Sequence, residues 1–329
     1  MPLLDIRNLQ LEFGRGANAL RALDGVSLVI EQGETVCLVG ESGSGKSVTA
    51  LSVARLVPSP PAHYVGGEIL LEGRDVLKMS PAALRAIRGG VASYVFQDPA
   101  ASLNPVFRAG HQILESLKLH RPAAATDAEV VRLLKLVGIP APESRARNYP
   151  HEMSGGMQQR VMIAMALASQ PKLLVADEPT TALDVTIQAQ IIELLRDLKQ
   201  QLGMAILLIT HNLGIVGDLA DRVAVMYAGQ IVETAPARAL LKRPLHPYTR
   251  ALMNSVPKLG AESTRLTSIP GNMPKLGAFP GGCRFHPRCP QARSECAGGM
   301  PELVEVEPQR WVRCPFWEEV SANGRGHTG

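Results

Sequence analysis

The chain has 329 residues, of which 46% are hydrophobic and 19% are charged, and its formal net charge at pH 7 is +4. This balance excludes a largely disordered chain and fits one long or two ordinary globular domains. No lysine–arginine block or aromatic–basic ladder occurs, so the sequence predicts no nucleic-acid partner. The N-terminus lacks the pattern of a secretion signal, and the apolar runs are too short to cross a bilayer. We therefore expect a cytosolic protein, free or held by a membrane protein.

The first forty residues predict β-strands. Leu9, Leu11 and Phe13 alternate with polar residues, as they do in a half-buried strand. Further strand-like stretches follow and end in the apolar run at 35–39. This β-rich opening therefore leads into the segment that begins at residue 40.

A phosphate-binding loop, G-E-S-G-S-G-K-S, occupies residues 40–47 directly after that run. Glycines let successive backbone N–H groups point at a polyphosphate, and a helix predicted at 48–56 adds its positive end. Lys46 would reach the β- and γ-phosphates, and the Ser47 hydroxyl would hold Mg²⁺. The alternative is an ordinary glycine-rich turn. The loop residues predicted to bind nucleotide are Gly40, Ser42, Gly43, Ser44, Gly45, Lys46 and Ser47.

Helical patterns replace strands between residue 98 and about residue 150. Thr126 and Glu129 are spaced as a capping box ahead of an amphipathic run, and Gly138 is expected to stop that helix. A second helix is predicted after the sequence S-G-G at 154–156. Its first residues, Ser154 and Gly156, would offer free amides and the helix dipole to a phosphate, which need not belong to the chain's own nucleotide.

Two acidic residues follow the apolar strand predicted at 173–176. The end of such a strand would deliver both side chains to the edge of the sheet where the phosphates lie. Asp177 would hold Mg²⁺, mostly through water, and Glu178 would polarise the attacking water. A solvated strand end is the alternative interpretation. A helix at 186–202 and strands at 205–209 and 223–227 complete the pattern of a parallel sheet with crossover helices, which is an α/β fold.

Four of the five cysteines lie in the last fifty residues, where proline and glycine are also frequent. Their spacing is C-x5-C-x6-C-x17-C, for Cys283, Cys289, Cys296 and Cys314. Disulfides are not expected in a reducing cytosol, and a segment with little apolar periodicity needs another source of order. Zinc sites usually present closely paired cysteines, whereas two of these precede proline, as ligands of iron–sulfur clusters can. We predict a [4Fe–4S] cluster, with Zn²⁺ or unligated thiols as alternatives.

The motifs occur in the order found in the ATP-binding-cassette (ABC) ATPases, and the chain resembles this family from residue 3 to about residue 235. They are the phosphate loop, Gln97 after an apolar strand, the signature at 153–157, Asp177-Glu178, Ala182-Leu183-Asp184 and His211. The resemblance implies a P-loop ATPase core with a parallel sheet, an antiparallel β subdomain and a helical subdomain. It also implies a second cassette, because two cassettes stack head to tail in this family and this chain carries one motif set.

The resemblance assigns roles to individual residues. Catalytic residues would be Glu178 as the base, His211 at the γ-phosphate and Gln97 at Mg²⁺ and water, whereas a structural cap is the alternative for His211. Mg²⁺ would be held by Ser47, Gln97 and Asp177. The partner's ATP would contact Ser154, Gly155 and Gly156, and Asp184 would line the dimer seam. Phe13 would stack on adenine, although its alternation also fits core packing.

The signature departs from the family pattern at two positions. Met153 and Met157 stand where Leu and Gln are usual, which makes its contribution to the partner's site less certain. The chain's own site keeps both Glu178 and His211, so the resemblance implies competent ATP hydrolysis.

Several segments resemble ATP-binding subunits of oligopeptide and dipeptide importers over nearly the whole chain. They are Q-D-P at 97–99, S-L-N-P at 102–105, the S-G-G-M signature and L-H-P-Y-T-R at 245–250. The implied function is ATP hydrolysis that powers peptide import. Implied partners are a second, related ATPase chain, two membrane permease subunits and, indirectly, a substrate-binding protein. The location would be peripheral, on the cytoplasmic face of the cell membrane, and the cofactors ATP and Mg²⁺.

The same resemblance implies that residues 98–116 form the groove for a cytosolic permease helix, with ordinary surface helices as the alternative. A similar extension in some peptide importers also supports the [4Fe–4S] prediction. Alternative cargoes are nickel, opines, glutathione and sugars. Two alternative functions are a soluble cassette ATPase in DNA repair or translation, and a metal or redox sensor that uses ATP as a switch.

We expect four parts along the chain. The nucleotide-binding core would take 1–97 and 161–235, with the helical subdomain at 98–160. A C-terminal extension with the cysteines would span 236–320, followed by a disordered tail at 321–329.

Overall fold

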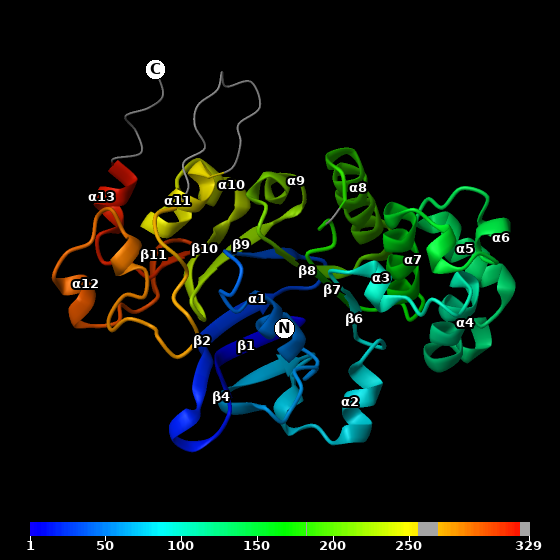
Figure 1. Ribbon diagram of the computed structural model, residues 1–329, viewed down its shortest axis with the longest axis horizontal. Helices are drawn as coiled ribbons and strands as arrows, with labels where there is room; N and C mark the ends of the chain where they lie inside the picture. Colours follow the sequence, from blue (N-terminus) through cyan, green and yellow to red (C-terminus); the bar gives the residue numbers. More distant parts are fainter. Residues whose placement is uncertain (182, 256–268, 323–329) are drawn as a thin grey trace.

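The computed structural model describes residues 1–181, 183–255 and 269–322, and its helical region and its C-terminal region lie at opposite ends of a central sheet (Figure 1). An antiparallel four-stranded sheet forms the N-terminal part. In sheet order its strands are β2 (Leu20–Ile30), β1 (Leu4–Phe13), β4 (Ala62–Leu71) and β5 (Arg74–Asp75). Leu9 and Leu11 are fully buried, as their alternation in the sequence predicts.

The central sheet has eight strands, five of which are parallel neighbours. These five are β6 (Ala92–Val95), β7 (Leu173–Asp177), β8 (Ala205–Thr210), β3 (Thr35–Val39) and β9 (Arg222–Tyr227). Every residue of β3 and β8 is buried, which is typical of parallel strands covered on both faces. The carboxyl ends of β3, β7 and β8 meet at one edge of the sheet, because their registers pair Val39 with Thr210 and Asp177 with Ile209.

Crossover helices cover this sheet. They include α1 (Lys46–Ser52), α8 (Val185–Leu202) and α9 (Val216–Leu219), whereas α2 (Pro81–Ile87) leads from the antiparallel sheet into β6. The helix after the phosphate loop begins two residues earlier than predicted and ends at Ser52 rather than at residue 56.

The helical region contains α3 (Pro99–Ser102), α4 (Ala109–His120), α5 (Asp127–Leu136), α6 (Pro142–Arg145) and α7 (Gly155–Leu167). Thr126 caps α5 by accepting a hydrogen bond from the Glu129 N–H at 3.2 Å. The Glu129 carboxylate instead accepts hydrogen bonds from Arg121 and Arg132, because these arginines offer it charged donors. Helix α7 packs against α3, α4, α5 and β6. It is continuous through residue 160, where the helical subdomain was expected to end and the core to resume, and this boundary stays a prediction.

The C-terminal extension is packed onto the core. Two short strands, β12 (Arg310–Val312) and β11 (Val304–Glu307), join the central sheet through β10 (Gln230–Pro236). Tyr227 of β9 lies 4.6 Å from Tyr248 and 5.2 Å from Phe285 between ring centroids, and all three are buried. The extension's helices are α10 (Ala237–Lys242), α11 (Pro247–Asn254), α12 (Glu295–Gly298) and α13 (Trp317–Ala322).

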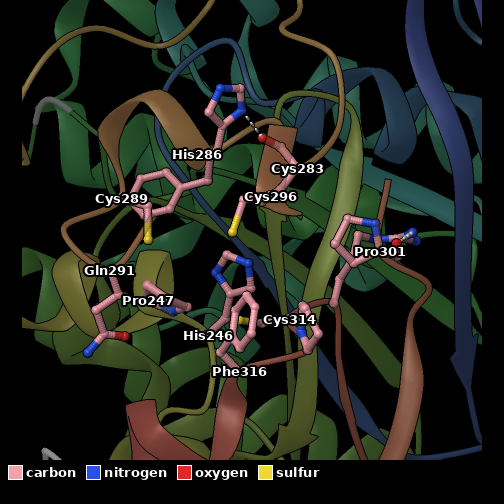
Figure 2. Close-up of a pocket in the computed structure, with 13 residues that line it drawn as sticks. His246, Pro247, Cys283, His286, Cys289, Gln291, Cys296, Pro301, Cys314 and Phe316 are labelled. Carbon is pink, nitrogen blue, oxygen red and sulfur yellow. Dashed lines mark hydrogen bonds between the residues drawn. The ribbon is translucent and has the colours of Figure 1, made fainter. Parts of the chain in front are cut away.

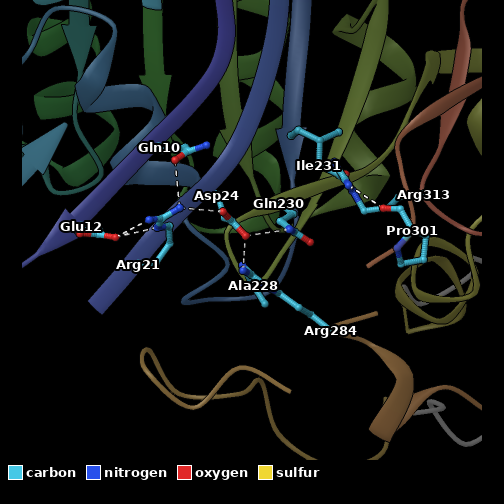
Figure 3. A network of polar contacts seen from close by, with 10 residues as sticks. All are labelled: Gln10, Glu12, Arg21, Asp24, Ala228, Gln230, Ile231, Arg284, Pro301 and Arg313. Carbon is cyan, nitrogen blue, oxygen red and sulfur yellow. Dashed lines mark hydrogen bonds and ion pairs between the residues drawn. The ribbon is translucent and has the colours of Figure 1, made fainter. Parts of the chain in front are cut away.

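A polar network ties the extension to β2 (Figure 3). The Arg284 guanidinium donates to the Asp24 carboxylate and to the Ala228 carbonyl. Asp24 also accepts from Gln230 at 3.1 Å and from Arg21 at 3.4 Å. The extension is therefore held to the antiparallel sheet as well as to the central one.

Helix α13 continues to Ala322, beyond the point where the tail was expected to begin, and the remaining tail, 323–329, lies outside the described residues. A search of the described part of the chain finds no helix with the length and apolar character that a membrane crossing needs.

Candidate functional site

The phosphate loop joins β3 to α1, as its sequence predicts. Gly45 precedes α1 with a φ of 108°, and a Cβ atom at Gly40 would lie 2.2 Å from the Met226 carbonyl oxygen. Only glycine fits these two positions without strain or collision. The buried Lys46 ammonium donates hydrogen bonds of 2.9 Å to the carbonyls of Gly40 and Glu41. Burial lowers the pKa of Lys46, and the nearby carboxylates of Glu178, Asp177 and Glu41 oppose that shift.

An open cavity of about 970 Å³ lies over this loop. Its walls include most residues predicted for the chain's own ATP site. They are Phe13, Gly40, Ser42, Gly43, Gly45, Lys46, Ser47, Gln97, Glu178 and His211. Ser44, another residue of the loop, is fully buried and does not line the cavity. Phe13 also packs on the hydrophobic core, so its stacking on adenine stays a prediction.

Glu178 is the meeting point of three polar side chains from separate segments. Its Oε2 atom lies 3.2 Å from Gln97 Nε2, 3.2 Å from His211 Nδ1 and 2.9 Å from Thr181 Oγ1. Its backbone has a φ of +48°, which non-glycine residues seldom adopt, and its N–H is held by the Ile209 carbonyl at 2.9 Å. The local fold thus directs one carboxylate into the cavity and surrounds it with donors.

Thr181 was not among the residues predicted for this site. The sequence did contain a signal for this residue, because Thr181 carries a hydroxyl three positions after Glu178, in the turn that follows β7.

The residues beside the loop fit a Mg²⁺ ion. Asp177 ends β7, and its Oδ1 atom is buried with no hydrogen-bond partner among the described residues. Burial raises the pKa of Asp177, and the neighbouring Ser47 hydroxyl acts in the opposite direction. A buried carboxylate oxygen that lacks a donor, placed near a hydroxyl and a phosphate loop, matches the oxygen ligands that Mg²⁺ prefers.

The signature lies away from this cavity. Ser154 caps α7 by accepting from the Met157 N–H at 3.4 Å, and Asp184 caps α8 by accepting from the Ile187 N–H at 2.9 Å. The two helix starts are in contact, because a Cβ atom at Gly156 would lie 2.9 Å from Ile187 Cγ2. Ser154 and Gly155 are exposed, and none of the predicted partner-facing residues lines the chain's own cavity.

Met153 and Ala182 also belong to the predicted motifs, and the structure describes only the first of them. Met153 is buried in the core, so it packs as an apolar residue at its position. Ala182 lies outside the described residues.

The C-terminal extension supplies one wall of the nucleotide cavity, which no motif indicated. The lining residues from this wall are Leu252, Met273, Pro274, Lys275, Leu276 and Phe279. Arg284 holds the wall by placing its guanidinium carbon 4.3 Å from the centroid of the Phe279 ring. The extension therefore helps to form the cavity predicted to bind ATP.

The four cysteines of the extension converge on one largely apolar cavity (Figure 2). Burial raises the pKa of three of their thiols, those of Cys283, Cys289 and Cys314, the last to about 12. All five cysteines of the chain are free thiols. Within the described ranges no three His, Cys, Asp or Glu side chains are arranged to hold a single metal ion. The four cysteines thus share a cavity, whereas neither the predicted cluster nor zinc is shown.

A phosphate loop at the end of a central parallel strand, facing a half-buried Asp–Glu pair, defines a P-loop nucleotide-binding ATPase. The family model of ABC transporters matches residues 23–181, and that of the oligopeptide/dipeptide transporter C-terminal region matches residues 232–296. The chain therefore combines a cassette with this type of extension.

Related proteins agree over nearly full length. A probable peptide ABC transporter ATP-binding protein of Sinorhizobium fredii is 50% identical over 97% of this chain and 96% of its own. The oligopeptide transport ATP-binding protein AppD of Bacillus subtilis is 48% identical over 97% of this chain and 98% of its own. Among solved structures, the cassette MJ0796, a dimer bound to ADP and phosphate, superposes with a TM-score of 0.63 at 28% identity, covering 71% of this chain and 99% of that one. This chain belongs to the ABC transporter family of ATP-binding proteins, which confirms the predicted family and fold.

Proposed function

We propose that this chain is the ATP-hydrolysing subunit that powers a membrane importer of peptides. The convergence of Gln97, His211 and Thr181 on the Glu178 carboxylate, opposite the phosphate loop, carries the proposal. The names of the full-length relatives and the family of the extension favour peptides over nickel, opines, glutathione or sugars as cargo. They also favour transport over DNA repair, translation or sensing.

Each side chain has a role in this proposal. Lys46 and the loop amides bind the β- and γ-phosphates, and His211 contacts the γ-phosphate. Glu178 takes up a proton from the attacking water, which Gln97 also contacts. Ser47, Asp177 and Gln97 would hold Mg²⁺, which neutralises charge on the phosphates when bound.

A second cassette would complete the site. Ser154, Gly155, Gly156 and Asp184 lie outside the chain's own cavity, at helix starts that suit a phosphate of another chain. We infer that this partner is a related ATPase chain rather than an identical copy.

A groove in the helical region would receive the permease. A cavity of about 390 Å³ is lined by Phe96, Leu103 and Ser116, among others. Nearby, Val106 is 70% exposed and Phe107 is 44% exposed, although both are apolar. These features support residues 98–116 as the permease contact, which would bind the chain to the cytoplasmic face of a membrane.

Purification of the tagged chain in mild detergent tests this function. We expect two permease chains and a second ATPase chain to co-purify. The variant Val106→Glu should lose the permease chains, because it places a charge on the exposed apolar surface, yet keep its affinity for ATP. The control Leu202→Glu changes an exposed leucine at the far end of α8 and should retain the permease. A chain that is fully active as a monomer without membrane partners would contradict the proposal.

We also propose that the four cysteines bind a [4Fe–4S] cluster, with Zn²⁺ as the alternative. The proposal is supported by the four cysteines that line one cavity and by the proline that follows Cys289 and Cys314. Anaerobically purified protein is expected to contain about four iron and four acid-labile sulfide per chain. Cys296→Ser should lower both contents, whereas Cys37→Ala, a change in β3 at a cysteine that does not line the cavity, should not. Zinc without sulfide would favour the alternative, and no metal would leave free thiols.

A further inference from the structure

One residue of the phosphate loop, Glu41, is bound on two sides by the C-terminal extension. Its carboxylate accepts two hydrogen bonds from the Arg288 guanidinium, of 3.0 Å at Oε1 and 2.9 Å at Oε2. Its backbone N–H donates to the Tyr248 hydroxyl oxygen at 2.8 Å. Glu41 and Arg288 are 247 positions apart in the sequence, so the fold alone brings them together.

Arg288 is built into the extension. Its side chain is only 6% exposed, and its Nε donates to the Pro270 carbonyl at 2.8 Å. The guanidinium also lies over the rings of Tyr227 and Phe285, with its carbon 5.8 Å and 6.0 Å from their centroids. Because these contacts leave the Arg288 side chain little rotamer freedom, its planar guanidinium is already oriented toward the Glu41 carboxylate.

Tyr248 is equally fixed. It lies in the first turn of α11, which His246 caps by accepting from the Tyr248 N–H at 3.1 Å. Burial lowers the pKa of His246 to about 3, so this imidazole is neutral and free to accept. The hydroxyl that holds the loop therefore belongs to a capped and buried helix.

The same loop residue also anchors the lysine of the ATP site. The Glu41 carbonyl accepts from Lys46 Nζ at 2.9 Å and from the Ser44 N–H at 3.2 Å. In addition, Glu41 lines the nucleotide cavity, where a free carboxylate would repel a triphosphate. We propose that Arg288 is a positioning residue for ATP binding: it neutralises Glu41 and, together with Tyr248, holds the phosphate loop in its binding conformation.

This inference rests on the proposed ATP site and adds residues of the extension to it. The phosphate loop contacts phosphate in the ground state and in the transition state alike. Loss of the Arg288 contact that holds this loop should therefore raise KM for ATP more than it lowers kcat. A role limited to holding the extension in place would instead lower thermal stability without acting on the phosphates.

Binding of ATP and of adenosine to the full-length chain separates these cases. Arg288→Met is expected to weaken ATP binding by at least about 10-fold, because it leaves the Glu41 carboxylate unpaired beside the phosphates. Adenosine binding should stay within about twofold, since adenosine carries no phosphate. The double variant Glu41→Gln/Arg288→Met should recover most of the ATP affinity, because the repelling charge is gone. Tyr248→Phe provides a smaller, shape-conserving test and should also weaken ATP binding selectively.

Arg238→Ala serves as the control, since Arg238 is an exposed arginine on α10 of the same extension. Three results would overturn the inference: Arg288→Met binding ATP as the wild type does, equal losses for ATP and adenosine, or a double variant as weak as Arg288→Met. A wild-type chain without affinity for ATP would overturn the ATP site itself, whereas normal wild-type binding with unaffected variants would overturn only the role of Arg288.

Discussion

Replacing Glu178 with Gln is expected to lower ATP turnover at least about 100-fold while ATP affinity changes little. The amide cannot take a proton from water, yet it keeps the shape and the hydrogen-bond reach of the carboxylate toward Gln97, His211 and Thr181. The variant should therefore bind ATP and accumulate as a closed dimer with the partner cassette. Steady-state phosphate release measures the first effect, and size-exclusion chromatography with and without ATP measures the second.

Glu193→Gln is the matched control, because Glu193 is an exposed glutamate on α8 that pairs with Arg196. It should hydrolyse ATP as the wild type does. Normal turnover by Glu178→Gln would remove Glu178 as the base.

Replacing Lys46 with Ala is expected to weaken ATP binding at least about 30-fold, since it removes a buried cation that would face the phosphates. The wild type should also lose affinity at alkaline pH. Burial lowers the pKa of Lys46, so its ammonium gives up its proton at a lower pH than an exposed lysine does, and ATP affinity falls as the pH rises through that value. Titration calorimetry over a range of pH measures both effects.

Lys118→Ala, at an exposed lysine of α4, should leave ATP affinity unchanged at every pH. An unchanged affinity in Lys46→Ala would mean that the loop binds its anion through backbone amides alone.

The parts of the site that follow a strand in the sequence were predictable, and those joined only by the fold were not. Lys46 lies at the end of the loop that follows β3, Asp177 ends β7 and Glu178 follows it, and an apolar run with a glycine-rich or acidic sequence behind it is a local pattern. The boundaries of α1 were less predictable, because Gly45 starts the helix through its backbone conformation rather than through a capping side chain.

The extension shows the opposite case. Arg288 contacts Glu41 of the phosphate loop although 247 positions separate them in the sequence. Strand β12 joins the central sheet by pairing with β10, and no periodic pattern in the sequence predicts this pairing. The C-terminal extension is ordered by buried aromatic rings and by arginine hydrogen bonds. Such single residues in loops produce no repeating pattern in a sequence. The wall at 273–279 was missed for the same reason.

Helix α7 has a mechanical consequence. Its 13 residues form a rod of about 20 Å. Ser154 stands at its first turn, and Met162 and Met165, farther along, face the 390 Å³ groove. A rigid rod cannot tilt at one end alone, so if a partner's nucleotide displaced its first turn, the end that bears Met162 and Met165 would move as well. In the proposed assembly, α7 would therefore couple nucleotide binding at the partner cassette to the orientation of the permease-facing groove.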